Sequence, residues 1–216
     1  MSFDVIGANF GFRGSANEAR DVFEQLKQGT ADLHRRVDTA VDLDVTCADV
    51  ASYRGLLSRL LGYYEPVEST LSTFDWQSIG LDYGPRRKLH LLVEDLHELG
   101  LDAGEIDSLP RFAVSPTPLC LAGAIGVMYV LEGATLGGQI IVKRVAKTLG
   151  LSASGGARFH AGYGTENGAM WRAFKTVGST HLKTDDQKDA ALHFARRTFE
   201  TYEAWLTSRA ELAAQS

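Results

Sequence analysis

The chain has 216 residues, of which 44% are hydrophobic, and a formal net charge of −5. This composition is ordinary for a soluble globular protein, and the length allows one large domain or two small ones. The negative charge argues against nucleic-acid binding and against a polybasic membrane surface, because both need an excess of Lys and Arg. Cys47 and Cys120 form no CxxC motif, so we expect neither a disulfide framework nor a zinc site, and the cysteine usage fits a reducing cytoplasm.

The N-terminal region divides into a lead-in and a long helix. Residues 1–14 carry several glycines and little periodicity, and we expect a flexible segment there. The Ser15-x-x-Glu18 pattern has the form of a capping box, and apolar residues follow it at helical spacing. The sequence therefore predicts a helix over 16–40, and we place one domain over 15–216.

Two further helices are predicted in the next part of the chain. Thr46-x-x-Asp49 can cap a second helix with an apolar stripe, which Pro66 can kink. The residues before Thr46 form a polar turn. A third helix covers 86–99 and ends at Gly100.

The C-terminal half predicts a loop followed by three helices. Residues 101–117 read as a loop, and a long apolar helix then covers about 119–149. A shorter helix covers 169–177, and the Thr184-Asp185-Asp186-Gln187 stretch can cap the last helix. No segment shows the alternation of a strand, so we predict a single all-α domain.

The long apolar helix carries three glycines within six residues, Gly133, Gly137 and Gly138. Each costs about 1 kcal/mol relative to alanine in a helix interior. Gly133 and Gly137 are four residues apart and share one face of the helix. The pattern indicates that something bulky or flat approaches the backbone closely: another helix, a lipid-embedded partner or a planar ligand.

A membrane span is an alternative for this segment. The run over 118–142 is long enough to span a bilayer, and Gly133-x-x-x-Gly137 matches a packing motif of membrane helices. Glu132 and Gln139 lie well inside the run, however, and a central acid costs several kcal/mol in lipid. We therefore expect no membrane span and interpret the segment as a central buried helix.

Among six histidines, His34 is the best placed for a ligand role. No HExxH pair or other metal-ligand pattern is present, and His90 and His97 only share a helix face. His34 borders an apolar stripe, and Asp38 follows one turn later, where a carboxylate can bond the second nitrogen of a metal-binding imidazole. Lys27 precedes it by two turns. A packed or surface histidine is the alternative interpretation.

Taken together, these segments resemble the heme oxygenase family, in particular its bacterial, phytochrome-associated branch. The resemblance covers about residues 20–210. The matching segments are Leu26-Lys27-x-x-Thr30-x-x-x-His34, Tyr63-Tyr64-Glu65-Pro66-Val67-Glu68, Tyr129-Val130-Leu131-Glu132-Gly133-x-x-Leu136-Gly137-Gly138 and Phe159-His160-x-Gly162-Tyr163-Gly164.

The resemblance implies a fold, a reaction and partners. The fold would be a heme oxygenase-like helical bundle, and the reaction the oxygen-dependent cleavage of heme to biliverdin, carbon monoxide and ferrous iron. Electrons would come from an external donor such as a ferredoxin or a reductase, because the sequence contains no flavin or nicotinamide motif. A phytochrome that uses the biliverdin is a further expected partner, and the expected location is the cytoplasm.

The resemblance also implies roles for individual residues. His34 would bind the heme iron, and Gly133 and Gly137 would let the distal helix lie close to the porphyrin. The remaining residues implied at the heme are Lys27, Tyr129, Gly138, Arg172 and Phe199.

One position departs from the family pattern. Some family members have an aspartate directly after the first distal glycine, where it orders water, and this chain has Ala134. Bacterial relatives often lack the acid, so the activity remains the expectation. Glu132, Thr135 and Gln139 are then the candidates for holding a water network.

Two alternative functions remain open at this point. A heme-binding or heme-sensing protein would keep the pocket without turnover, and poorly organised distal water around Ala134 would favour it. A non-heme member of the same superfold, of the thiamin-degrading or di-iron kind, would need a cysteine nucleophile or several inward Glu and His pairs. Neither Cys47 nor Cys120 has such a context.

Overall fold

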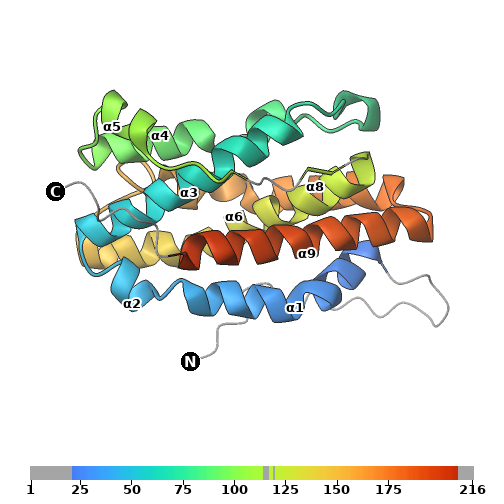
Figure 1. Ribbon diagram of the computed structural model, residues 1–216, viewed down its shortest axis with the longest axis horizontal. Coiled ribbons are helices and arrows are strands. Elements are labelled where there is room, and N and C mark those ends of the chain that lie inside the picture. The colour runs from blue at the N-terminus through green and yellow to red at the C-terminus, as the bar shows by residue number, and fades with distance from the viewer. Residues whose placement is uncertain (1–20, 114–116, 119, 209–216) are drawn as a thin grey trace.

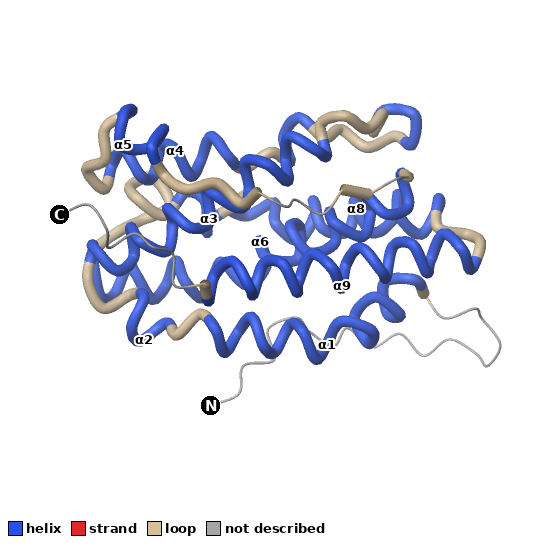
Figure 2. Tube along the Cα trace, in the orientation of Figure 1, coloured by secondary structure: helices blue, strands red, loops and turns tan. Residues whose placement is uncertain are grey.

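The computed structural model describes residues 21–113, 117–118 and 120–208, and these ranges are built of helices joined by short connections (Figures 1 and 2). The α-helices are α1 (Val22–Ala40), α2 (Leu43–Thr46), α3 (Val50–Leu71), α4 (Leu89–Glu98), α5 (Ala103–Ser108), α6 (Leu121–Leu149), α7 (Arg158–Ala161), α8 (Asn167–His181) and α9 (Asp185–Thr207). The described part of the chain contains no β-strand, which confirms the all-α prediction. The predicted lead-in over 1–14 and the capping box at Ser15 lie outside the described residues.

Aspartate caps set the starts of the first long helices. The Asp21 carboxylate accepts a hydrogen bond from the Phe23 N–H at 3.2 Å, and Asp49 accepts one from the Ser52 N–H at 2.7 Å. The predicted cap at Thr46 is wrong, because Thr46 is the last residue of the short helix α2. The predicted end of the first helix at residue 40 is confirmed.

The structure contains two short helices that were not predicted, and one predicted helix is longer than expected. The 101–117 segment contains α5, which begins with a complete capping box between Asp102 and Glu105. Helix α7 lies in a glycine-containing break, and α8 is longer than the predicted 169–177. Helices of six and four residues have fewer than two turns, so they carry no readable hydrophobic periodicity.

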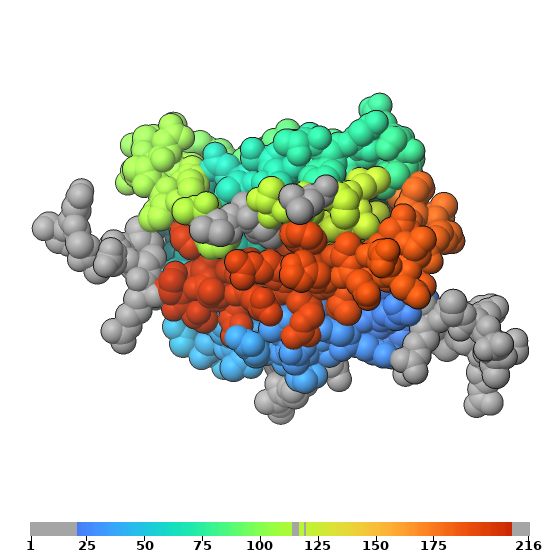
Figure 3. Space-filling model, turned by 45° about the vertical axis from the view of Figure 1, so that its right-hand side comes forward, coloured from blue at the N-terminus to red at the C-terminus, as the bar shows by residue number. Residues whose placement is uncertain are grey.

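Helix α6 is the centre of the bundle. In Figure 1, α9 lies in front of it, α1 and α2 lie below, and α3, α4 and α5 lie above. The space-filling view shows α9 as a band between α1 and the upper helices (Figure 3). Helix α6 is long and apolar enough to cross a membrane, but 61% of its apolar window is buried by the other helices. It therefore has the environment of a core helix in a globular protein.

Helices α6 and α9 approach each other so closely that one contact requires glycine. A Cβ atom built at Gly126 would overlap the backbone carbonyl of Ala191 in α9. Backbone atoms cannot rotate away as a flexible side chain can, so the two helices would have to separate.

We expect Gly126→Ala to lower the free energy of unfolding by about 1–3 kcal/mol, the usual cost of overpacking a core. Gly55 of α3 is the matched control, because a Cβ atom there meets nothing within 4 Å. Gly55→Ala should stabilise the protein by up to about 1 kcal/mol through helix propensity. Urea denaturation of both variants tests this pair, and equal effects would contradict the packing argument.

Candidate functional site

A pocket lies where α6 faces α1, α7 and α9. Its wall is largely apolar, with a few polar side chains. The lining residues are His34, Val37, Asp38, Val41, Leu43, Tyr129, Val130, Gly133, Ala134, Gly137, Gly138, Ile140, Ile141, Phe159, His160, Phe199 and Tyr202. An apolar cavity with a few placed polar groups is typical of a cofactor or small-molecule site.

His34 is held on the α1 side of this pocket by two contacts. Its Nδ1 lies 3.0 Å from Oδ2 of Asp38, as the sequence spacing predicted. Its ring meets the Phe199 ring edge-on, with centroids 5.7 Å apart. With Nδ1 donating its proton to the carboxylate, Nε2 is left with a free lone pair, the state in which imidazole binds a metal.

Helix α6 presents small residues to the pocket. Gly133, Ala134 and Gly137 all line it, together with Tyr129 one turn earlier. Gly138 also lines it but has a further role, because a Cβ atom there would overlap the carbonyl of His160 in α7. The glycine pattern predicted that some group lies close to the α6 backbone. At Gly138 this group is the backbone of α7.

Two of the predicted contact residues lie outside the pocket wall. Lys27 of α1 and Arg172 of α8 are both exposed and do not line the pocket. Helix α8 instead contributes Trp171, whose ring packs 5.8 Å from that of Tyr129, to the surrounding core.

The acid inside the apolar helix belongs to a buried ion cluster rather than to the pocket. Glu132, only 2% exposed, accepts hydrogen bonds from Arg86 at 2.6 Å, Lys88 at 2.9 Å and the Tyr163 hydroxyl at 2.6 Å. Two cations and a phenol thus compensate the cost of burying this carboxylate. The other two candidates for a water network also lie outside the pocket wall: Thr135 is buried, and Gln139 donates to the Ala161 carbonyl at 3.1 Å.

His160 also lines the pocket, and its sequence pattern predicted no role for it. It is 5% exposed, and its Nδ1 lies 3.0 Å from the Tyr53 hydroxyl of α3. Burial lowers the pKa of His160 to about 3, and burial raises the pKa of the Tyr53 phenol. Both groups are therefore neutral near pH 7. The Phe159-His160 motif was visible in the sequence, but its position at the pocket depends on the short helix α7.

The lowered pKa of His160 predicts acid sensitivity of the fold. Below about pH 6.5 the unfolded chain binds a proton on this histidine, while the native protein does so only near pH 3. The unfolded state binds more protons in this window, so stability present above pH 6.5 is lost as the pH falls. Between pH 6 and pH 5 the loss is about 1 kcal/mol. Urea denaturation should show a shallower pH dependence in His160→Gln, and an unchanged slope would contradict the assignment.

The arrangement defines the class of site. Within the described residues no cluster of three or more His, Cys, Asp or Glu side chains could hold a bare metal ion. Of the two histidines that line the pocket, His34 is the one oriented by a carboxylate, and a glycine-bearing helix forms another wall of the pocket. One such imidazole suits a flat metal-containing ligand that brings its own equatorial ligands. A helical protein with one axial histidine for heme fits this description.

Comparison with known proteins gives the family. The heme oxygenase family model matches residues 20–208, and the chain belongs to this family. It is similar to the heme oxygenase of Xanthomonas campestris pv. campestris (strain 8004), with 29% identity over 167 residues, which are 75% of this chain and 93% of the relative.

Two solved structures confirm the fold. The heme oxygenase of Neisseria meningitidis superposes with a TM-score of 0.76 at 23% identity, covering 92% of this chain and 96% of that one. The heme oxygenase of Leptospira interrogans gives a TM-score of 0.68 at 20% identity, covering 87% and 98%. The chain is an enzyme that degrades heme to biliverdin, with heme, oxygen and a reductant as its reactants.

Proposed function

We propose that heme lies in the pocket between α1 and α6, with Nε2 of His34 as the axial ligand of its iron. The observation that carries this proposal is the Asp38 contact, which fixes the tautomer of His34 while the ring borders the pocket. The apolar lining supports the proposal, because it suits the faces of a porphyrin.

The protein's own part in the reaction is to orient heme and restrict space on its second face. Gly133 and Gly137 have no side chains, so the α6 backbone itself forms that wall. Bound heme supplies the iron that activates oxygen and the ring that is oxidised, while a separate reductant provides electrons. A wall of backbone leaves space for a small ligand only on one side of the iron, which would select the ring carbon that is attacked.

The edge of the heme carries two carboxylates, which need cations or hydrogen-bond donors. We assign this role to Lys27 and Arg172, and to Tyr129, which lines the pocket. Lys27 lies two turns before His34 on α1, and Arg172 follows Trp171, which packs on Tyr129. Both cations are exposed, so their flexible side chains are free to turn toward a ligand at the rim.

The electron donor and the user of the product complete the proposal. We propose a ferredoxin or a separate reductase as donor, since the sequence carries no flavin or nicotinamide motif of its own. The resemblance to the phytochrome-associated branch supports a phytochrome as the acceptor of biliverdin. The cysteine usage supports a cytoplasmic location.

Turnover in air tests the proposed function. Hemin is added to the purified protein, followed by ascorbate or a ferredoxin system, and the visible spectrum is recorded. We expect a Soret band on binding, then its loss with growth of the broad red absorption of biliverdin. A Soret band that persists after reduction in air would favour heme binding without turnover. No spectral change on hemin addition would overturn the proposed pocket.

A further inference from the structure

His160 is the pocket histidine that the proposed function leaves without a task. It is buried to all but 5%, and it lines the same pocket as His34 from a different helix. The Tyr53 hydroxyl engages its Nδ1 at 3.0 Å. The only side-chain hydrogen bond of His160 to a described residue is the one at Nδ1, and the ring borders the pocket. We therefore look in the pocket for the partner of its other ring nitrogen, Nε2.

The contact with Tyr53 determines which nitrogen of His160 carries the proton. A neutral imidazole has one N–H and one lone pair, and a phenol has a single proton to donate. His160 is the hydrogen-bond partner of the Tyr53 hydroxyl in this buried site. Donation from the phenol to Nδ1 satisfies both groups, whereas the opposite tautomer leaves the phenol proton without an acceptor. Nε2 is therefore the N–H donor.

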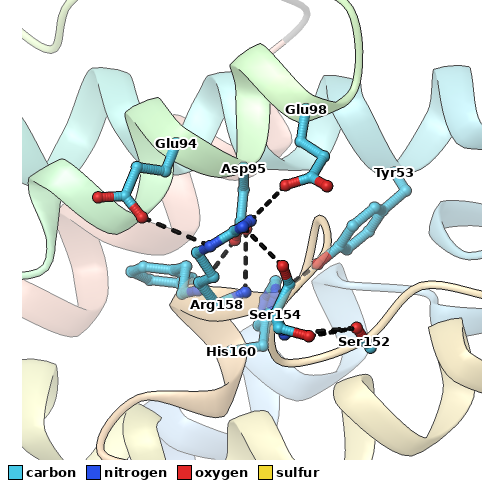
Figure 4. Close-up of polar contacts among 9 residues, drawn as sticks. Tyr53, Glu94, Asp95, Glu98, Ser152, Ser154, Arg158 and His160 are labelled. Carbon is cyan, nitrogen blue, oxygen red and sulfur yellow. Dashed lines mark hydrogen bonds and ion pairs between the residues drawn. The ribbon is translucent and has the colours of Figure 1, made fainter.

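Helix α7 is fixed so that this ring cannot easily move. The buried Asp95 carboxylate of α4 accepts hydrogen bonds from the backbone N–H groups of Arg158 and Phe159, both at 2.9 Å. The Arg158 side chain in turn pairs with Glu94, Asp95 and Glu98 of α4 (Figure 4). The hydrogen bonds to Asp95 take the place of the side-chain N-cap that α7 lacks.

The other end of α7 is held equally firmly. Its last carbonyl, that of Ala161, accepts hydrogen bonds from Gln139 of α6 at 3.1 Å and from Asn167 of α8 at 3.0 Å. Gly138 lets α6 lie directly against the His160 backbone. Helix α7 has only four residues, but hydrogen bonds fix it to α4, α6 and α8, so the backbone that carries His160 is rigid.

We propose that His160 is a hydrogen-bond donor to small ligands in the heme pocket, presenting Nε2–H to water or to a small anion on the iron face opposite His34. This inference rests on the proposed function. Ala134 of α6 has no polar side chain, so the hydrogen-bond donor comes from α7 instead. Tyr53 of α3 acts as the positioning residue that fixes the donor tautomer of His160.

The test uses ligands that report a hydrogen bond without turnover. The ferrous heme complex is prepared under carbon monoxide without oxygen, and the C–O stretching frequency is measured by infrared spectroscopy. A hydrogen-bond donor near the oxygen atom of the bound carbon monoxide lowers this frequency, so His160→Leu should raise it. Azide binding to the ferric complex should weaken about 10- to 100-fold, the usual effect of losing a hydrogen bond to a charged group.

Two further variants separate the donor role from a general disturbance. Tyr53→Phe keeps the imidazole but frees its tautomer, so a second C–O band at higher frequency should appear beside the first. His193→Leu, at an exposed histidine of α9 outside the pocket, should change neither the frequency nor the azide affinity.

The outcomes distinguish this inference from the proposed function. A Soret band with an unchanged C–O frequency and unchanged azide affinity in His160→Leu would overturn the donor role alone. A six-coordinate low-spin spectrum that His160→Leu abolishes would also overturn it, because His160 would then bind the iron directly. Failure of the native protein to bind hemin would overturn both.

Discussion

Replacing His34 with alanine is expected to reduce heme turnover by more than about 100-fold. Loss of a group that merely supports a metal ligand costs about 10- to 100-fold, and loss of the ligand itself should cost more. The side chain of His34 is 25% exposed, so its truncation should leave the fold intact. The rate of biliverdin formation and the ferrous heme spectrum measure the effect, since the five-coordinate histidine signature should disappear.

Two companion variants make this result specific. Asp38→Asn keeps a hydrogen-bonding group next to Nδ1 but removes the charge, and we expect an intermediate loss of about 10-fold. His90→Ala changes an exposed histidine of α4 outside the pocket and should behave as the native protein does. Turnover by His34→Ala at the native rate would mean that another residue binds the iron.

Replacing Gly137 with leucine should separate activity from stability. A branched side chain at this position would occupy the pocket on the α6 side, and a displacement of reacting groups by about 1 Å can cost about 100-fold in rate. Leucine is also a better helix former than glycine by almost 1 kcal/mol, so the helix itself is not weakened. We expect a large loss of turnover, or a changed biliverdin isomer, with little loss in the melting temperature.

The measurement combines thermal unfolding with chromatographic analysis of the product isomers. Gly55→Ala serves as the control, because it changes a helix glycine far from any neighbouring atom. If Gly137→Leu forms the same isomer at the same rate, then the α6 backbone does not restrict the heme, and the role proposed for the glycines is wrong.

The long helices could be predicted from the sequence because each buries one face. The stripe containing Tyr53 and Leu57 is fully buried in α3, and the Thr184 capping box marks the start of α9 as expected. The short helices α5 and α7 could not be predicted in this way. Helix α7 lacks a cap of its own and depends on Asp95, which lies 63 residues before Arg158 in the sequence.

The site was predictable where its contacts are local. His34 and Asp38 are one helical turn apart, so their spacing alone predicted the contact that the structure shows at 3.0 Å. His160 depends on Tyr53, 107 residues earlier, and no local pattern contains that information. Glu132 was misjudged for the same reason, because its partners Arg86 and Lys88 come from a distant turn.

A crystal structure of the ferric heme complex would show directly where heme binds and which residue binds its iron. We predict the heme between α1 and α6, with its iron bound to Nε2 of His34 and with Gly133 and Gly137 facing the opposite side of the ring. Iron bound to His160 or to any other side chain would contradict the assignment of His34, and a heme outside this pocket would contradict the proposed site.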